Sequence, residues 1–225
     1  MVLKRKVEVD NLDFIYSLGS LVVSSREEVL TLLVQHIYLS AVAITLAALI
    51  AIPGGILISR VKILGGPLIA IAGVLYNIPS LALFGFLVPF FGIGPVTALI
   101  ALCVYAILPL LRNTYIGLTE VDPAIVEAAK GMGVNNWQLL WRVQMPLALP
   151  VIMTALRQVV VMTIGITAIA AFVGAGGLGI LVFRGRGMMD SPMIVYSTLL
   201  IALLAIIADR SFGFAERKIR EKMGV

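Results

Sequence analysis

The stretch "EAAKGMGVNNWQLLWRVQMPLALP", residues 127–150, lies between two strongly apolar segments of the chain. Just before it, Asp122 is a residue type that caps the start of a helix, and Pro123 suits the first helical position. Gly131 and Gly133 permit the left-handed turn that ends a helix. A simple connection between apolar segments needs neither feature. We therefore expect a short, rigid helix here that contacts a partner.

A second helix is predicted within the same stretch. Asn135 or Asn136 can cap its start. Three large side chains share one face of it by their i, i+3 and i+4 spacing: Trp137, Leu140 and Trp141. Pro146 is expected to end it, because proline cannot donate the backbone hydrogen bond that continues a helix. The alternative is an amphipathic hairpin that lies on lipid headgroups without a protein partner.

The chain as a whole is 60% hydrophobic and 13% charged over 225 residues, whereas an average soluble domain carries about 25% charged residues. A soluble fold of this size could not bury so much apolar surface, so the composition indicates an all-α integral membrane protein. Crossing the bilayer as a helix takes about 20 apolar residues. Five segments approach this length: 37–58, 67–91, 95–111, 147–173 and 192–208.

The flanks of these segments define the predicted organisation. Three regions follow: an N-terminal extension (1–36), a transmembrane domain (37–210) with its loop at 112–146, and a cytoplasmic tail (211–225). Within the extension, residues 26–36 place apolar side chains on one face and are expected to form an interfacial helix. His36, at the start of the first span, is expected at the membrane interface.

The distribution of Lys and Arg predicts the orientation of the chain. If the 112–146 loop is cytoplasmic, ten of the 17 basic residues lie inside and six outside. Cytoplasmic loops of membrane proteins carry the excess of positive charge. The bias predicts a cell-membrane protein with its N-terminus outside and its C-terminus inside. It also accounts for the net charge of +5, so nucleic acid is not an expected partner.

The predicted spans contain no Asp or Glu. Carriers driven by protons or sodium ions generally use an intramembrane carboxylate to bind the ion. Energy for uphill transport is therefore expected from a partner protein. The single histidine, His36, and the single cysteine, Cys103, provide no pattern for a metal site or an internal disulfide.

A polar break interrupts the second apolar segment at "YNIPS", residues 76–80. Pro79 removes a backbone donor and disfavours helical geometry at the residue before it. We expect Tyr76, Asn77 and Ser80 to line a substrate path, where the Tyr76 ring could attract a cationic substrate. The alternative is a kink whose free backbone groups are satisfied by neighbouring helices.

The fourth span holds the remaining polar candidates. Thr163 and Thr167 lie one turn apart and could line the same path, although such hydroxyls often bond to their own helix backbone. Arg157 is expected to extend to the cytoplasmic side or to donate to backbone carbonyls in the bundle. The "GAGGLG" that follows, residues 174–179, has the spacing of a dinucleotide-binding turn, but an apolar span precedes it, so we expect a tight turn or close backbone packing.

The loop between the third and fourth spans resembles the EAA signature of ABC importer permeases, which is Glu-Ala-Ala, a glycine after three further residues, and Ile-x-Leu-Pro after nine more. The matching residues are Glu127, Ala128, Ala129, Gly133, Val143, Met145 and Pro146. Val143 and Met145 depart from the pattern, which has Ile and Leu there. The resemblance implies that this loop couples the permease to a cytoplasmic ATPase.

Three longer stretches, 76–94, 108–133 and 165–179, resemble the osmoprotectant branch of that family, and the likeness covers roughly residues 27–212. It implies the type I ABC importer permease fold and uptake of glycine betaine, carnitine or choline. It implies three partners: two copies of an ATPase subunit, a second permease copy in a homodimer or heterodimer, and an extracytoplasmic solute-binding protein. ATP and Mg²⁺ would then bind the ATPase, and this chain would bind no cofactor and would not itself be an enzyme.

Three other functions remain open from the sequence. The permease could serve an importer for methionine or another amino acid. It could be a channel or carrier that works without an ATPase, which the absence of acidic residues in the spans argues against. It could be a structural membrane anchor whose loop rests on headgroups, which co-purification with an ATPase would exclude.

Overall fold

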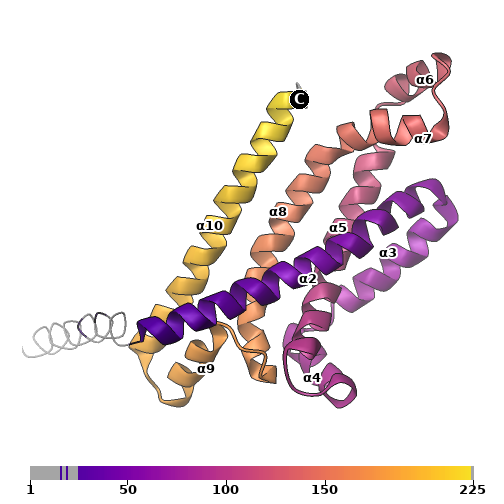
Figure 1. The fold of residues 1–225 in the computed structure, drawn as a ribbon. Helices are drawn as coiled ribbons and strands as arrows, with labels where there is room; N and C mark the ends of the chain where they lie inside the picture. The colour runs from indigo at the N-terminus through magenta and orange to yellow at the C-terminus, as the bar shows by residue number, and fades with distance from the viewer. Residues whose placement is uncertain (1–15, 17–18, 20–24, 224–225) are drawn as a thin grey trace, which may run out of the picture.

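The computed structural model describes residues 16, 19 and 25–223. All regular structure within 25–223 is helical, which confirms the predicted all-α class. The elements in chain order are α2 (Arg26–Arg60), α3 (Lys62–Tyr76), α4 (Ser80–Phe91), α5 (Pro95–Thr119), α6 (Pro123–Gly131), α7 (Asn136–Gln138), the π-helical segment η1 (Leu139–Gln144), α8 (Met145–Ala170), the 3₁₀ turn η2 (Ala171–Val173), α9 (Gly179–Gly187) and α10 (Ser191–Met223). Helices α6 and α7 lie at one end of the molecule with the end of α10, and α4 and α9 lie at the opposite end (Figure 1).

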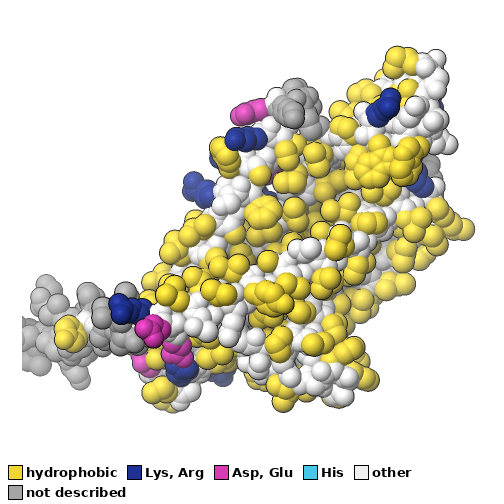
Figure 2. All heavy atoms as spheres, viewed as in Figure 1, with side chains coloured by type: hydrophobic (Ala, Val, Ile, Leu, Met, Phe, Trp, Pro, Cys, Tyr) yellow, Lys and Arg dark blue, Asp and Glu magenta, His cyan; other side chains and the backbone are white. Residues whose placement is uncertain are grey.

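Four helical segments of the described chain are long and apolar enough to cross a membrane. Helices α3 and α4 are together long and apolar enough for a fifth span, although they meet at a bend of 96°. Figure 2 shows apolar side chains over the middle of the visible face, with charged side chains gathered toward the ends. The molecule is therefore a multi-pass membrane protein, with a span count that agrees with the five predicted segments.

The first helix, α2, is continuous over 35 residues. Residues 26–36, expected as an interfacial helix, are its first turns and lead into 37–58 without a break. His36 is fully buried, with 0% of its surface exposed, so it packs between helices, and its expected level at the membrane interface stays a prediction. Pro53 sits inside the helix without ending it.

Helices α2 and α5 pack closely through small residues. Four of them recur at every fourth position of α2 and are buried: Ala43, Ala47, Ala51 and Gly55. A methyl group at Gly55 would lie 2.5 Å from the Cβ of Thr114 in α5. Small residues at this spacing let helix backbones approach in a membrane, where packing replaces the hydrophobic effect as the main attraction between helices.

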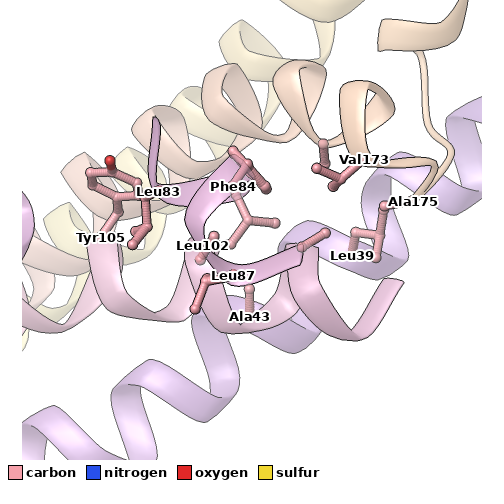
Figure 3. Packing of buried hydrophobic residues seen from close by; sticks show 12 residues of the cluster. Leu39, Ala43, Leu83, Phe84, Leu87, Leu102, Tyr105, Val173 and Ala175 are labelled. Atoms are coloured by element: carbon pink, nitrogen blue, oxygen red, sulfur yellow. The ribbon is translucent and has the colours of Figure 1, made fainter. Parts of the chain in front are cut away.

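A cluster of buried apolar side chains joins α2, α4, α5 and the end of η2 at the α4 end of the molecule (Figure 3). Phe84 of α4 is fully buried in it. Leu102 of α5 and Val173 of η2 belong to the same cluster, as does Leu39 of α2. The short helix α4 is thus fixed against the long helices, which holds the bend between α3 and α4 in place.

The connection from α5 to α8 differs from the expected loop at both ends. α5 continues to Thr119, beyond the predicted span end at residue 111. The second predicted helix does not end at Pro146. Instead α7 passes through η1 directly into α8, so that residues 136–173 form one continuous helical segment.

The last helix, α10, is also longer than its predicted span of 192–208. It runs from Ser191 to Met223, so the expected tail is helical over its described part. Its tertiary contacts are made mainly with α8 and α9. Little of its apolar span is buried within the single chain, and it brings Asp209 and Glu216 to the side of α8.

Candidate functional site

Helix α6 is fixed at both ends by the residues that the sequence singled out. The Asp122 side chain accepts a hydrogen bond of 2.8 Å from the backbone N–H of Ala124, and Pro123 is the first helical residue. After the helix, Gly133 has φ = +80°, and the N–H of Val134 donates to the carbonyl of Ala129 over 3.3 Å. This nine-residue helix therefore has a defined start and a defined end.

The start of α7 resolves the choice between two asparagines. The Asn135 side chain accepts from the N–H of Gln138 at 2.9 Å, and the Gln138 side chain accepts from the N–H of Asn135 at 3.1 Å. This reciprocal pair is a capping box, with Asn135 as the cap. The turn between α6 and α7 is therefore locked on both sides.

The two tryptophans of the chain lie together on the outside of this element. Their ring centroids are 5.6 Å apart, with the planes inclined by 62°, and both side chains are exposed. Leu140, expected on the same face, is buried instead and packs in a cluster with Leu118 and Ile152. The predicted face is thus divided: the indoles point outward, and the leucine holds η1 against α5 and α8.

Of the Glu-Ala-Ala residues, Glu127 and Ala128 are exposed and Ala129 is buried. Ala129 is 3% exposed and faces inward, where α6 contacts η1. Four exposed residues form what we call the α6 surface: Glu127, Ala128, Gly131 and Met132. Ala128 has a small side chain, Gly131 has none, and Met132 has a flexible apolar one. Another protein surface could therefore approach this helix closely.

The second half of the signature lies where η1 becomes α8. Val143, Met145 and Pro146 are all half-buried. The Met145 N–H bonds to the carbonyl of Leu140, five residues back. Proline cannot donate to the carbonyl four residues before it, and its ring would collide with that carbonyl. The wider turn of η1 accommodates Pro146 and bends the segment without breaking it.

Gln144 connects this element to two spans, and the sequence analysis did not single it out. Its side-chain carbonyl accepts from Arg60 at the end of α2 over 2.6 Å. Its side-chain amide donates to the backbone carbonyl of Leu118 in α5 over 3.4 Å. One signal was available, since Gln144 is the polar residue within the apolar "V-Q-M-P". Because η1 bonds to α2 and α5 through Gln144 and continues into α8, a displacement of η1 would act on all three helices.

At the bend between α3 and α4, two tyrosines approach each other. The Tyr76 and Tyr105 ring centroids are 6.0 Å apart, edge to face, and the Tyr76 hydroxyl donates to the sulfur of Met162 over 3.5 Å. The Tyr105 hydroxyl donates to the carbonyl of Ile78. A neighbouring helix thus satisfies a backbone group that the break at Pro79 leaves free, as the kink alternative required.

The five candidate path residues fall into two groups. Tyr76, Asn77 and Ser80 lie at the bend, where Asn77 is exposed and the other two are half-buried. Thr163 and Thr167 are buried on the side of α8 that faces α2, where the Thr167 hydroxyl donates to the Thr163 carbonyl at 2.7 Å and contacts the Ser40 hydroxyl at 2.9 Å. The structure thus places the first three at the bend and the two threonines on the side of α8 that faces α2.

Arg157 has carboxylate partners in the structure. Its Nε and Nη2 donate to the two carboxylate oxygens of Asp209 over 2.6 and 2.7 Å, and Nη1 lies 3.5 Å from Glu216. The expectation of backbone carbonyls as partners is therefore wrong. The predicted fifth span ends at residue 208, so it leaves out Asp209, the next residue, and Glu216, about two turns further along α10.

The "GAGGLG" segment forms both features that were expected of it. Gly174, Gly176 and Gly177 have positive φ angles of 71°, 91° and 84°, which side chains other than glycine rarely adopt. Any side chain at Gly179 would overlap the carbonyl of Ala168 in α8. The segment is a tight turn that folds directly back against the helix before it.

Helix α2 holds this turn through two consecutive polar residues. His36 Nδ1 accepts from the N–H of Leu178 at 3.3 Å, and its Nε2–H donates to the carbonyl of Ile164 at 2.9 Å. Since Nδ1 accepts a backbone donor, the ring carries its proton on Nε2. Gln35 accepts from the N–H of Gly177 at 3.2 Å. The buried histidine is therefore fully bonded and positions the turn.

The structure thus combines apolar spans with a capped, exposed helix between α5 and α8. The model of a family described as binding-protein-dependent transport system inner membrane component matches residues 43–221. The chain belongs to this family. It is a permease subunit of an ABC importer and acts in transport, not as an enzyme.

Similar proteins agree with this assignment. The permease is 45% identical over 180 residues to the osmoprotectant import permease protein OsmW of Salmonella typhimurium, covering 78% of this chain and 84% of that protein. It is 42% identical over 186 residues to the carnitine transport permease protein OpuCD of Listeria monocytogenes, covering 82% and 83%. A solved structure of the MetNI methionine ABC transporter matches with a TM-score of 0.77 at 23% identity, covering 85% of this chain and 95% of that one. At this identity, the last match establishes the fold alone.

Proposed function

We propose that this permease passes a small osmoprotectant of the glycine betaine, carnitine or choline type across the membrane, powered by an ATPase that docks on the α6 surface. The α6 surface and its mechanical connections carry the coupling part of this proposal. The helix α6 is capped at both ends and exposes small residues. It contacts η1, which Gln144 joins to α2 and α5. A rigid element of this kind can transmit displacement, which a flexible loop would dissipate.

The substrate class rests on the sequence relatives. Those that match at 36 to 45% identity carry names for osmoprotectant, carnitine, choline and glycine betaine transport. These substrates are quaternary ammonium compounds, which aromatic faces attract. Tyr76 and Tyr105, edge to face at the bend, are the aromatic pair that would meet such a cation. Asn77 and Ser80 would offer polar atoms beside it, and Thr163 and Thr167 would join the path in the assembled importer.

The assembly would contain two copies of the permease, two ATPase subunits that bind ATP and Mg²⁺, and a binding protein outside. The end of the molecule that carries α6 and the end of α10 would face the cytoplasm, with the N-terminus of the chain outside. The bound receptor would trigger closure of the ATPase pair. Through α6 and η1, closure would shift the spans and open the path.

The test is ATP-dependent uptake of radiolabelled glycine betaine and carnitine into vesicles that contain the permease with its ATPase and receptor. Glu127→Lys should abolish uptake and co-purification of the ATPase while leaving membrane insertion intact. Glu120→Lys, the same charge change before α6, is the matched control. Normal uptake by the Glu127 variant would contradict the docking surface. Uptake of methionine but not of the quaternary ammonium compounds would contradict the substrate class.

A further inference from the structure

A polar cleft of about 560 Å³ lies between α8 and α10, at the end of α10 that lies on the same side as α6 (Figure 1). Six charged residues line it, two acids and four arginines: Asp209, Glu216, Arg157, Arg210, Arg217 and Arg220. The proposed transport cycle uses none of them. The cleft is therefore a separate feature of the membrane domain.

At the bottom of the cleft, the Arg157 side chain packs against α10. Gly213 of α10 is buried, and a methyl group on it would come within 3.0 Å of the Arg157 guanidinium carbon. The guanidinium therefore lies directly on the backbone of α10. It binds Asp209 with two bonds of 2.6 and 2.7 Å, a bidentate pair that fixes its plane.

Both acids of the cleft are already engaged. Glu216 accepts from the Thr154 hydroxyl at 2.7 Å and pairs with Arg220 at 3.2 Å as well as with Arg157 at 3.5 Å. Among the residues that the structure describes, neither Arg210 nor Arg217 forms an ion pair. They lie two helical turns apart on α10 and both border the cleft. The cleft thus has a surplus of two positive charges.

The depth of these arginines follows from the length of α10. Arg210 is nineteen residues after Ser191, the first residue of the helix, which corresponds to about 29 Å at the rise of an α-helix. The hydrocarbon core of a bilayer is about 30 Å thick. Arg210 and Arg217 therefore reach the level of the phospholipid headgroups, and this holds for either orientation of the chain.

We propose that this cleft binds a phosphate group, with Arg210 and Arg217 as its ligands beside the immobilised Arg157–Asp209 pair. Guanidinium groups suit this role because their paired N–H donors match phosphate oxygens. Basic pockets between membrane helices at headgroup level bind anionic lipids by the same chemistry. An anionic phospholipid headgroup and a free phosphate ion both present this group, and the experiment distinguishes them.

The experiment uses the full-length chain and native mass spectrometry with phosphatidylglycerol or phosphatidylcholine. Arg217→Gln is compared with Lys218→Gln, because the two residues are adjacent and carry the same charge. Lys218 lies outside the cleft, with its amine 4.5 Å from the Phe214 ring centroid. We expect the wild type to retain phosphatidylglycerol over phosphatidylcholine, Arg217→Gln to lower that retention roughly fivefold, and Arg210→Gln with Arg217→Gln roughly thirtyfold. Lys218→Gln should stay close to the wild type.

A second measurement separates the two sources of phosphate. Inorganic phosphate is added to protein in phosphatidylcholine nanodiscs, and the thermal unfolding midpoint is recorded. A rise in the wild type that Arg217→Gln lacks would assign the site to soluble phosphate, and the absence of such a rise together with lipid retention would assign it to the headgroup. Equal losses of phosphatidylglycerol in Arg217→Gln and Lys218→Gln would show general attraction and overturn the proposal. Binding of neither phosphatidylglycerol nor phosphate would also overturn it.

Discussion

Gly133 shows how a single residue of the loop between α5 and α8 can act through backbone conformation. A methyl group there would meet no atom within 4 Å, but the residue has φ = +80°. We expect Gly133→Ala to destabilise the turn by about 1–2 kcal/mol and to lower ATP-dependent uptake and ATPase binding. Gly133→Asn is the matched control, because asparagine tolerates this conformation. If both variants transport equally, the backbone conformation does not explain the glycine.

Gly55 illustrates the opposite case, in which space and not conformation requires glycine. Its added methyl group would lie 2.5 Å from the Cβ of Thr114 and 3.0 Å from the carbonyl of Leu111. We expect Gly55→Ala to destabilise the protein by about 1–3 kcal/mol, because α2 and α5 would have to move apart. The measurement is the thermal unfolding midpoint in detergent.

The control for that measurement is Gly73→Ala in α3, where a methyl group would meet no atom within 4 Å. Alanine favours a helix over glycine by about 1 kcal/mol, so this variant should unfold at or above the wild-type midpoint. Equal losses at the two positions would show that close packing of α2 on α5 is not the cause.

At the scale of elements, the side chain of Gln144 is predicted to transmit motion from η1 to the spans. Gln144→Leu would keep the apolar packing of η1 but remove the bonds to Arg60 and Leu118. We expect the ATPase still to co-purify, whereas the amount of substrate imported per ATP hydrolysed should fall several-fold. Arg142→Gln, on the exposed side of the same segment, should change this ratio little. Unchanged coupling in Gln144→Leu would contradict the transmission.

Local sequence signals predicted where helices and turns form, but they did not always predict where a helix ends. The cap at Asp122, the break at Pro79 and the turn at 174–179 depend on a few adjacent residues, and the structure confirms them. The end expected at Pro146 was wrong because a π-helical turn can accommodate a proline that an α-helical turn cannot. The extension of α10 was missed because hydropathy marks where apolar character ends, whereas the helix continues into charged residues.

At the scale of the whole molecule, the orientation can be tested by labelling from one side. In a Cys103→Ser background, Met188→Cys places a thiol at an exposed position beside α9, and Lys218→Cys places one at an exposed position on α10. We expect a membrane-impermeant maleimide to label position 188 in intact cells and position 218 only after permeabilisation. The reverse pattern would place the N-terminus inside and would move the α6 surface to the wrong side for an ATPase.

Contacts between distant parts of the chain were the least predictable from sequence. His36 bonds to residues 128 and 142 positions away, and Arg157 to an acid 52 positions away. Composition and local spacing identify such residues as unusual but cannot identify their partners, since these depend on how the helices pack. The loop between α5 and α8 was more accessible because its signature is local, whereas the division of the path candidates between the α3–α4 bend and the side of α8 that faces α2 is a property of the packed bundle.

The pairing of the two indoles beside α6 has a practical consequence. Trp137 and Trp141 are the only tryptophans in the sequence, and both are exposed on the element that would receive the ATPase. Ultraviolet emission from unlabelled permease excited at the red edge of absorption would therefore come from this segment alone. With an ATPase whose own tryptophans have been replaced, the wavelength and quenching of this emission would report binding and release of the ATPase, with no dye attached.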